Sequence, residues 1–240
     1  MMRTIILGML LILAVACQKN DLKMYSGRNT IQMADVSDSL TRYSFYFQEE
    51  NVKEDTIWIQ FRTTGYTSSS PREITLRQVE LEGVTNAMEG THYSLVQERL
   101  NMPANAVYTD IPIVLYKENL AEKASYFIAL ELVENNDFKL GELDKLSFKI
   151  EFSSDILRPS LWSYANYEQY YWGTWSYNKH LWMITQTKHM WDDEFFTEVY
   201  AEPGLAKFWR EKLNELLAKY NANGGVLVDD AGIVINGFPN

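Results

Sequence analysis

The sequence contains a single cysteine, Cys17, so the chain cannot form an internal disulfide. A chain of 240 residues, 46% of them hydrophobic, can fold without one when its core is large enough. Basic residues are also few: 22 lysines and arginines stand against 32 acidic residues, a formal net charge of −10. Phosphate groups are bound by clustered lysine and arginine. The composition therefore argues against nucleic acid as a partner and against membrane attachment through surface charge.

The common catalytic sequence motifs are absent as well. The sequence has no G-x-S-x-G, Walker, G-x-G-x-x-G or H-E-x-x-H motif. Besides His92, the histidines are His180 and His189, whose spacing of nine residues does not place both on one helix face to bind a metal. We therefore expect no catalytic residues, no metal site and no cofactor.

The tightest group of carboxylates is Asp192, Asp193 and Glu194. Acidic residues are favourable at a helix N-terminus, so we interpret this group as a helix start or a solvated loop. A glycosidase needs two carboxyl groups about 5–9 Å apart across the sugar, and residues distant in sequence can form such a pair. A lipid-anchored glycan hydrolase therefore stays open as an alternative.

The N-terminal residues predict export. Arg3 precedes an unbroken apolar run of 12 residues, 5–16, which fits a signal peptide and is too short to span a bilayer as a helix. Small residues lead from this run into Cys17, and the site resembles a lipobox, where bacterial lipoproteins are cleaved and acylated on the new N-terminal cysteine. We expect residues 1–16 to be a signal peptide and residues 17–29 a lipidated, polar tether. The alternative is an ordinary secretory signal with an incidental cysteine.

The anchor sets the predicted location. Each buried methylene adds about 0.8 kcal/mol of membrane affinity, so two or three acyl chains on Cys17 would hold the protein permanently at a membrane. Residues 18–21, Gln-Lys-Asn-Asp, resemble the export signal of Bacteroidetes surface lipoproteins. We expect a lipid-anchored outer-membrane protein on the cell surface, with the periplasmic leaflet as the alternative.

Residues 30–154 alternate between apolar and polar side chains, the pattern of half-buried strands. Turn residues separate the runs at 65–71, 83–90, 103–105 and 135–141. Several short strands without a helical pattern between them predict a mainly β fold, with an immunoglobulin-like antiparallel β-sandwich over this range. Pro112 lies inside one run and indicates an edge strand, because proline cannot donate to a sheet.

Residues 155–240 lose the alternation and are rich in aromatic residues. Thr174 or Ser176 can cap a helix that runs towards Lys188. Helical spacing of apolar residues from Leu205 to Tyr220, with Pro203 at the expected start and Asn-Gly-Gly after it, predicts a second helix. The apolar runs 226–228 and 233–235 predict a terminal β-hairpin. We expect a small, mainly helical C-terminal domain.

Short motifs in both regions resemble known families. Residues 87–93 read Ala-x-Glu-Gly-Thr-His-Tyr, followed by the β-type runs 111–115 and 130–138, and this resembles a Calx-beta type of immunoglobulin-like domain. Residues 173–179 read Gly-Thr-Trp-Ser-Tyr-Asn-Lys. This segment is similar to the Gly-x-aromatic-Ser-x-x-Lys segment of a Bacteroidetes lipoprotein family of unknown function that pairs such a domain with a compact C-terminal region. Some Calx-beta domains bind calcium, but His92 stands where an aspartate is usual, so we do not expect that site.

The segment from Trp162 to Trp182 contains the strongest candidates for ligand binding. Flat tryptophan and tyrosine rings bury the apolar faces of sugars, and their polar tips form hydrogen bonds. A small helical domain also needs large side chains in its core, so most of these rings are expected to be structural. One or two should be exposed, and we select Trp172 and Trp175. Together with Tyr177 they are our ligand-binding candidates.

The resemblance implies a role beside glycan-uptake machinery. The leading hypothesis is a non-enzymatic, lipid-anchored accessory protein that captures polysaccharide, with the membrane and a glycan as its partners. The first alternative is a structural or protein-binding subunit of an outer-membrane transporter complex, and the second is the lipid-anchored glycan hydrolase.

Overall fold

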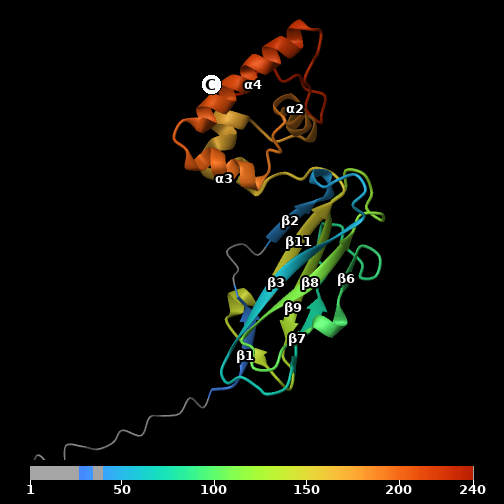
Figure 1. Cartoon of the computed structure of the whole chain (residues 1–240). Helices are drawn as coiled ribbons and strands as arrows, with labels where there is room; N and C mark the ends of the chain where they lie inside the picture. The colour runs from blue at the N-terminus through green and yellow to red at the C-terminus, as the bar shows by residue number, and fades with distance from the viewer. Residues whose placement is uncertain (1–26, 35–39, 240) are drawn as a thin grey trace, which may run out of the picture.

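The computed structural model describes residues 27–34 and 40–239 of the chain. The predicted signal peptide and Cys17 lie outside the described residues. A β part and a smaller helical part follow each other along the chain and in space (Figure 1). Within the described ranges, no helix is both long enough and apolar enough to cross a bilayer.

The β part contains two curled sheets and a small third one. The first has five strands in the order β10-β1-β3-β8-β6, the second has the order β2-β11-β9-β5, and β4 pairs with β7. The strands are β1 (Thr30–Met33), β2 (Leu40–Ser44), β3 (Glu54–Thr64), β4 (Arg72–Glu73), β5 (Thr75–Gln78), β6 (Tyr93–Leu95), β7 (Asn101–Met102), β8 (Tyr108–Tyr116), β9 (Tyr126–Val133), β10 (Lys139–Leu140) and β11 (Ser147–Ser153). Most pairs are antiparallel, and the pairs β1–β10 and β2–β11 are parallel.

The alternation in the sequence forms the core between the sheets. Ile111, Ile113 and Leu115 of β8 are fully buried, and so is Phe61 of β3. Residues of the second sheet complete the same hydrophobic cluster, namely Ile128, Leu130, Leu132, Phe148, Ile150 and Phe152. Successive side chains of a strand point to opposite faces, so one face of each sheet packs inward.

Pro112 does not mark an edge strand, because β8 lies between β3 and β6. The pairing with β6 covers only residues Ile113 to Leu115 of β8, and Pro112 pairs with Trp58 of β3 alone. The proline therefore lies just beyond the end of its short neighbour, where the missing N–H costs no hydrogen bond to β6.

The helical part is built from three α-helices and two irregular segments. Its elements are η4 (Ser160–Asn166), the π-helix η5 (Glu168–Trp172), α2 (Tyr177–Thr187), α3 (Asp193–Ala201) and α4 (Leu205–Ala222). Short 3-10 turns in the β part are η1 (Phe45–Phe47), η2 (Gln97–Arg99) and η3 (Leu143–Lys145). Ser176 caps α2, Lys188 ends it in a left-handed conformation, and Asn223 ends α4, as the sequence predicts. Pro203 lies before the capping residue Gly204 and not inside the helix.

Aromatic rings fill the core of the helical part. Trp162, Trp172, Trp191 and Phe196 are fully buried and meet largely edge to face. Large buried rings supply the apolar area that a small helical unit needs. This explains most of the aromatic excess in the sequence.

One prediction about fold class needs correction. Strands and helices each make up 29% of the described residues, so the chain as a whole is mixed and not mainly β. The predicted terminal hairpin is present in a short form, with one antiparallel bridge between Val228 and Val234 and backbone hydrogen bonds on either side of it. The Asp229 carboxylate accepts from the N–H groups of Ala231 and Ile233 in its turn.

Candidate functional site

The segment 173–179, Gly-Thr-Trp-Ser-Tyr-Asn-Lys, joins the π-helix to α2. Ser176 accepts a hydrogen bond from the backbone N–H of Lys179 and so caps α2. The Asp230 carboxylate accepts from the N–H groups of Tyr177 and Asn178, at 2.7 and 2.9 Å, in the first turn of the same helix. A negative charge is favourable at this end of a helix. The segment therefore has a structural role, because it forms the capped N-terminus of α2.

Lys179 has a buried amine that hydrogen-bonds to the backbone around this segment. Its Nζ donates to the backbone oxygens of Trp172 and Thr174 and lies 5.6 Å from the ring centre of Trp162. Burial lowers the pKa of Lys179 to about 8. A side chain on Gly173 would meet this amine at 3.2 Å, and Gly173 has a φ of +67°, so glycine is required there.

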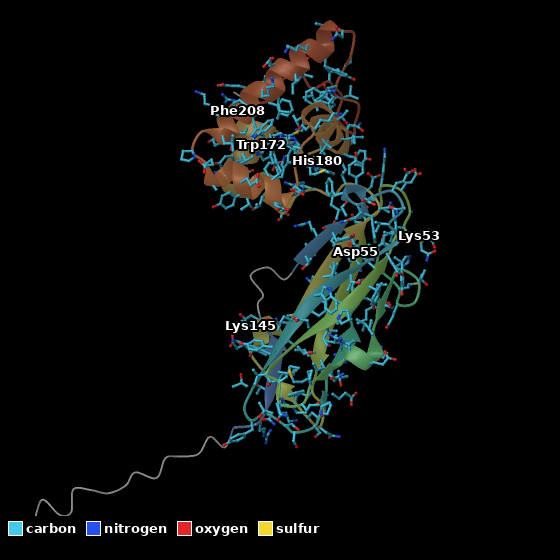
Figure 2. All side chains as sticks on the ribbon, viewed as in Figure 1. Lys53, Asp55, Lys145, Trp172, His180 and Phe208 are labelled. Carbon is cyan, nitrogen blue, oxygen red and sulfur yellow. The ribbon has the colours of Figure 1, made fainter. Side chains whose placement is uncertain are left out.

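Trp172 is fully buried, and the prediction that it exposes its ring to a ligand is wrong. Its indole N–H donates to the hydroxyl of Tyr200 at 2.9 Å, and its ring meets Trp191 and Phe196 edge to face. Figure 2 shows Trp172 and His180 inside the helical part. The sequence pattern did not reveal this, because the π-helix turns its side chains differently from an α-helix.

Trp175 is half-buried, and its indole N–H already forms a hydrogen bond within the protein. Its indole N–H donates to Nδ1 of His180, and Nε2 of His180 contacts the backbone oxygen of Trp191 at 3.0 Å. Because a carbonyl can only accept, Nε2 carries the proton and Nδ1 is free to accept. The imidazole is thus held neutral, and its burial lowers the pKa of His180 to about 4.

Trp175 and Tyr177 line a cleft of about 580 Å³ between the β part and the helical part. Charged residues of both signs line it too, including Lys123, Glu151 and Asp230. Most of these groups already have partners: Glu151 binds Arg42 and Lys123 lies 4.7 Å from the ring centre of Tyr177. The Tyr177 hydroxyl donates to Asp155 at 2.6 Å. The structure brings these two sequence-based candidates together, and their role in ligand binding stays a prediction.

A cluster of stacked tyrosines is the feature that sequence reasoning missed. Tyr164, Tyr167, Tyr171 and Tyr200 form what we call the tyrosine face. Tyr167 lies 4.1 Å from Tyr200, 5.0 Å from Tyr171 and 6.4 Å from Tyr164 between ring centres, at interplanar angles of 35°, 27° and 17°. Tyr164 is 56% exposed, and Tyr170, in the π-helix, is 52% exposed. The signal lay in the sequence as a run of tyrosines between 164 and 171, but their common orientation depends on the irregular backbone.

The hydroxyl groups of this surface are available. Within the described part of the chain, no protein group hydrogen-bonds to the hydroxyls of Tyr164, Tyr167 or Tyr171. The Tyr200 hydroxyl, by contrast, donates to the backbone oxygen of Leu161 at 3.0 Å and fixes the cluster to the core. The surface therefore offers the exposed ring of Tyr164 beside the hydroxyls of the half-buried Tyr167 and Tyr171, and Arg210 lies over the Tyr171 ring.

The carboxylate group at 192–194 is a helix start, as the sequence predicts. Asp192 caps α3 by accepting from the N–H of Phe195, and Asp193 accepts from the N–H groups of Ser160 and Leu161. The three carboxylates line a cavity of about 300 Å³, but two of them are already used by the backbone. Among the described residues, no group of three or more histidine, cysteine, aspartate or glutamate side chains could hold a metal ion.

The chain belongs to the family described as a domain of unknown function, DUF4843, whose sequence model matches residues 23–189. The match spans all the strands and the segment 160–187 of the helical part. No curated protein matches the chain.

Several solved structures share partial similarity with it. A proposed carbohydrate-binding protein from Bacteroides ovatus is 13% identical, with a TM-score of 0.37, over 52% of this chain and 36% of that one. A two-domain protein of unknown function from Bacteroides fragilis is 10% identical, with a TM-score of 0.40, over 52% and 45%. A multidomain protein from Bacteroides ovatus that includes DUF1735 is 13% identical, with a TM-score of 0.37, over 52% and 45%. This chain thus spans less than half the length of these proteins, and similarities of this size assign neither fold nor function.

Proposed function

We propose that this protein is a non-enzymatic surface lipoprotein that captures a polysaccharide beside glycan-uptake machinery. Acyl chains on Cys17 anchor it to the outer membrane. An immunoglobulin-like β part of the Calx-beta type acts as a spacer, and the helical part binds the polysaccharide. Strand β1 lies at the end of the β part away from the helices, so an anchor at the N-terminus would direct the helical part outward (Figure 1).

The observation that carries this proposal is the tyrosine face. A sugar ring has an apolar C–H face and a rim of hydroxyl groups, and a tyrosine ring with a free hydroxyl matches both. Tyr164 offers such a ring at the surface, stacked on Tyr200 at 5.6 Å and 25°. Since the stack is fixed through the Tyr200 hydroxyl, little conformational entropy is lost when a ligand binds.

A protein-binding role is the second candidate, and a different surface favours it. Val226, Ile233 and Val234 flank the terminal turn and are 61%, 66% and 48% exposed. Exposed apolar side chains that gather in one place favour contact with another protein. A subunit of an outer-membrane transporter complex would use this turn.

The test is a glycan array probed with the detergent-solubilised full chain, followed by calorimetry on each hit. Binding to at least one polysaccharide, without release of reducing ends on prolonged incubation, supports the proposal. Release of reducing ends would contradict the non-enzymatic role. Absence of binding to every glycan, with co-purification of an outer-membrane transporter, would favour the second candidate instead.

A further inference from the structure

A polar pocket of about 460 Å³ lies in the segment that carries the tyrosine face. The side chains that line it come from Ser163, Asn166, Glu168, Gln169 and Thr174, together with the backbone of Gly173. Every one of these residues belongs to η4, to η5 or to the turn that follows. A single stretch of 12 residues, 163–174, therefore builds the whole pocket.

Three of the lining side chains are unused by the protein. In the part of the chain that the structure describes, the amides of Asn166 and Gln169 and the hydroxyl of Thr174 form no hydrogen bond with another residue, and all three residues are exposed. Each amide has a carbonyl acceptor and two N–H donors, and the hydroxyl both donates and accepts. The pocket thus offers hydrogen-bond donors and acceptors, from amides and from a hydroxyl, within one concave surface.

The charges in the pocket are already paired. Glu168 accepts from Ser163 Oγ at 2.5 Å and from Arg158 at 3.1 Å through one oxygen, and from the N–H of Trp175 at 3.3 Å through the other. No free cation remains among the residues that line the pocket. A ligand that carries charge would gain little here, whereas neutral hydroxyl groups match the unused amides and the threonine.

The backbone around the pocket is irregular in a way that costs free energy. Ala165 and Asn166 are consecutive residues in the left-handed region, with φ of +46° and +66°, and a π-helix follows at once in η5. A left-handed alanine costs about 1–2 kcal/mol, while asparagine adopts this conformation more readily. Such conformations gather at functional sites, and π-helices do so as well. Asn166 belongs to the left-handed pair and Gln169 to the π-helix, and both residues are exposed.

We infer that the pocket formed by Asn166, Gln169 and Thr174 is a subsite for one neutral, polyhydroxylated sugar residue. This inference rests on the proposed glycan capture and assigns it a second point of contact. The tyrosine face supplies stacking, and the pocket supplies the hydrogen bonds that select among sugars. Hydrogen bonds to hydroxyl groups discriminate between sugars more sharply than stacking does, because a mismatched ligand leaves polar groups unpaired.

The experiment compares Gln169→Ala and Thr174→Val with wild type by affinity electrophoresis in gels that contain single polysaccharides. The gels are xylan, galactomannan and starch as neutral probes, and polygalacturonate as an acidic one. Gln97→Ala is the matched control, because Gln97 is an exposed glutamine of the β part in η2. All variants are the full chain in detergent, and their circular dichroism is compared with that of wild type to verify folding.

Retardation of wild type in a neutral gel, weakened at least about 5-fold in Gln169→Ala and in Thr174→Val but unchanged in Gln97→Ala, is the expected result. Unchanged retardation of both pocket variants would overturn the subsite and leave glycan capture intact. Retardation in polygalacturonate alone would overturn the assignment to a neutral sugar. A wild-type chain that no gel retards would overturn the subsite and the proposed function together.

Discussion

Trp175 donates its indole N–H to Nδ1 of His180, and the two nitrogen atoms lie 3.3 Å apart. His180 is fully buried, so this hydrogen bond keeps a neutral imidazole inside the helical core. A protonated ring would have no acceptor for its second N–H, since Trp175 can only donate there.

Stability should therefore fall in mild acid. The pKa of His180 is about 4 in the folded chain and about 6.5 for an unperturbed histidine. Between these values the unfolded chain holds more protons than the folded one. The contribution of the neutral His180 to stability is fully present above pH 6.5 and is lost as the pH falls through 4. The free energy of unfolding falls by up to about 3 kcal/mol.

Urea denaturation at pH 7.5 and pH 4.5 measures this loss. His180→Gln should show a smaller difference between the two pH values than wild type does, whereas His189→Gln, with an exposed histidine two residues beyond α2, should behave like wild type. Equal pH dependence in all three proteins would contradict the role of His180.

Lys179→Met should destabilise the helical part by about 2–4 kcal/mol at pH 7. The substitution keeps most of the apolar stem but removes the amine, so the backbone oxygens of Trp172 and Thr174 lose their donor. Lys207→Met is the control, because Lys207 is exposed on α4 and its nearest carboxylate, of Glu211, lies 3.9 Å away. Thermal unfolding followed by circular dichroism measures both. Unchanged stability of Lys179→Met would contradict this prediction. It would mean that burying the charge costs as much free energy as its two hydrogen bonds contribute.

Tyr177→Phe should loosen the junction of the two parts. The Tyr177 hydroxyl binds the Asp155 carboxylate, and the backbone oxygen of Asp155 accepts from Ser44 Oγ at 2.7 Å, so the linker is held from both sides. We expect a loss of about 1 kcal/mol and faster proteolytic cleavage between residues 154 and 159. Tyr46→Phe, the same substitution at a tyrosine that is 39% exposed on the β side of the junction, should leave the cleavage rate unchanged. Equal rates in both variants would show that other contacts hold the junction.

Cys17→Ala should release the protein from membranes. A formal net charge of −10 does not favour attachment to an anionic bilayer, so in the proposed function the acyl chains hold the protein at the membrane. Detergent fractionation and mass spectrometry of the N-terminal peptide measure the change. An unmodified thiol in wild type, or equal membrane content in the variant, would exclude the lipid anchor.

The sequence predicted the regular elements well, because their rules are local. Alternation in β8 and helical spacing in α4 each report which face is buried, and Ser176 and Asn223 mark helix ends through backbone hydrogen bonds close by. The carboxylates at 192–194 begin α3, which is one of the two interpretations that the sequence supported.

The site was harder to predict, because it depends on irregular backbone. Nothing in the spacing of Trp172 distinguishes it from Tyr171 or Tyr170, yet the π-helix buries the first and exposes the last. The left-handed pair Ala165 and Asn166 lies between Tyr164 and Tyr167, and alanine gives no signal of such a conformation. Sequence reasoning thus selected Trp172 as an exposed ring, and the structure buries it.

Calorimetric titration of the full chain and its Tyr164→Ala variant, with a polysaccharide that the array identifies, tests the central claim most directly. Tyr108→Ala is the control, since Tyr108 is similarly exposed, at 53%, but belongs to the β part. We predict that loss of the outermost ring of the tyrosine face weakens binding at least about 5-fold, or about 1 kcal/mol, while the control binds as wild type does. Undiminished affinity in Tyr164→Ala would contradict the assignment of this surface to glycan capture.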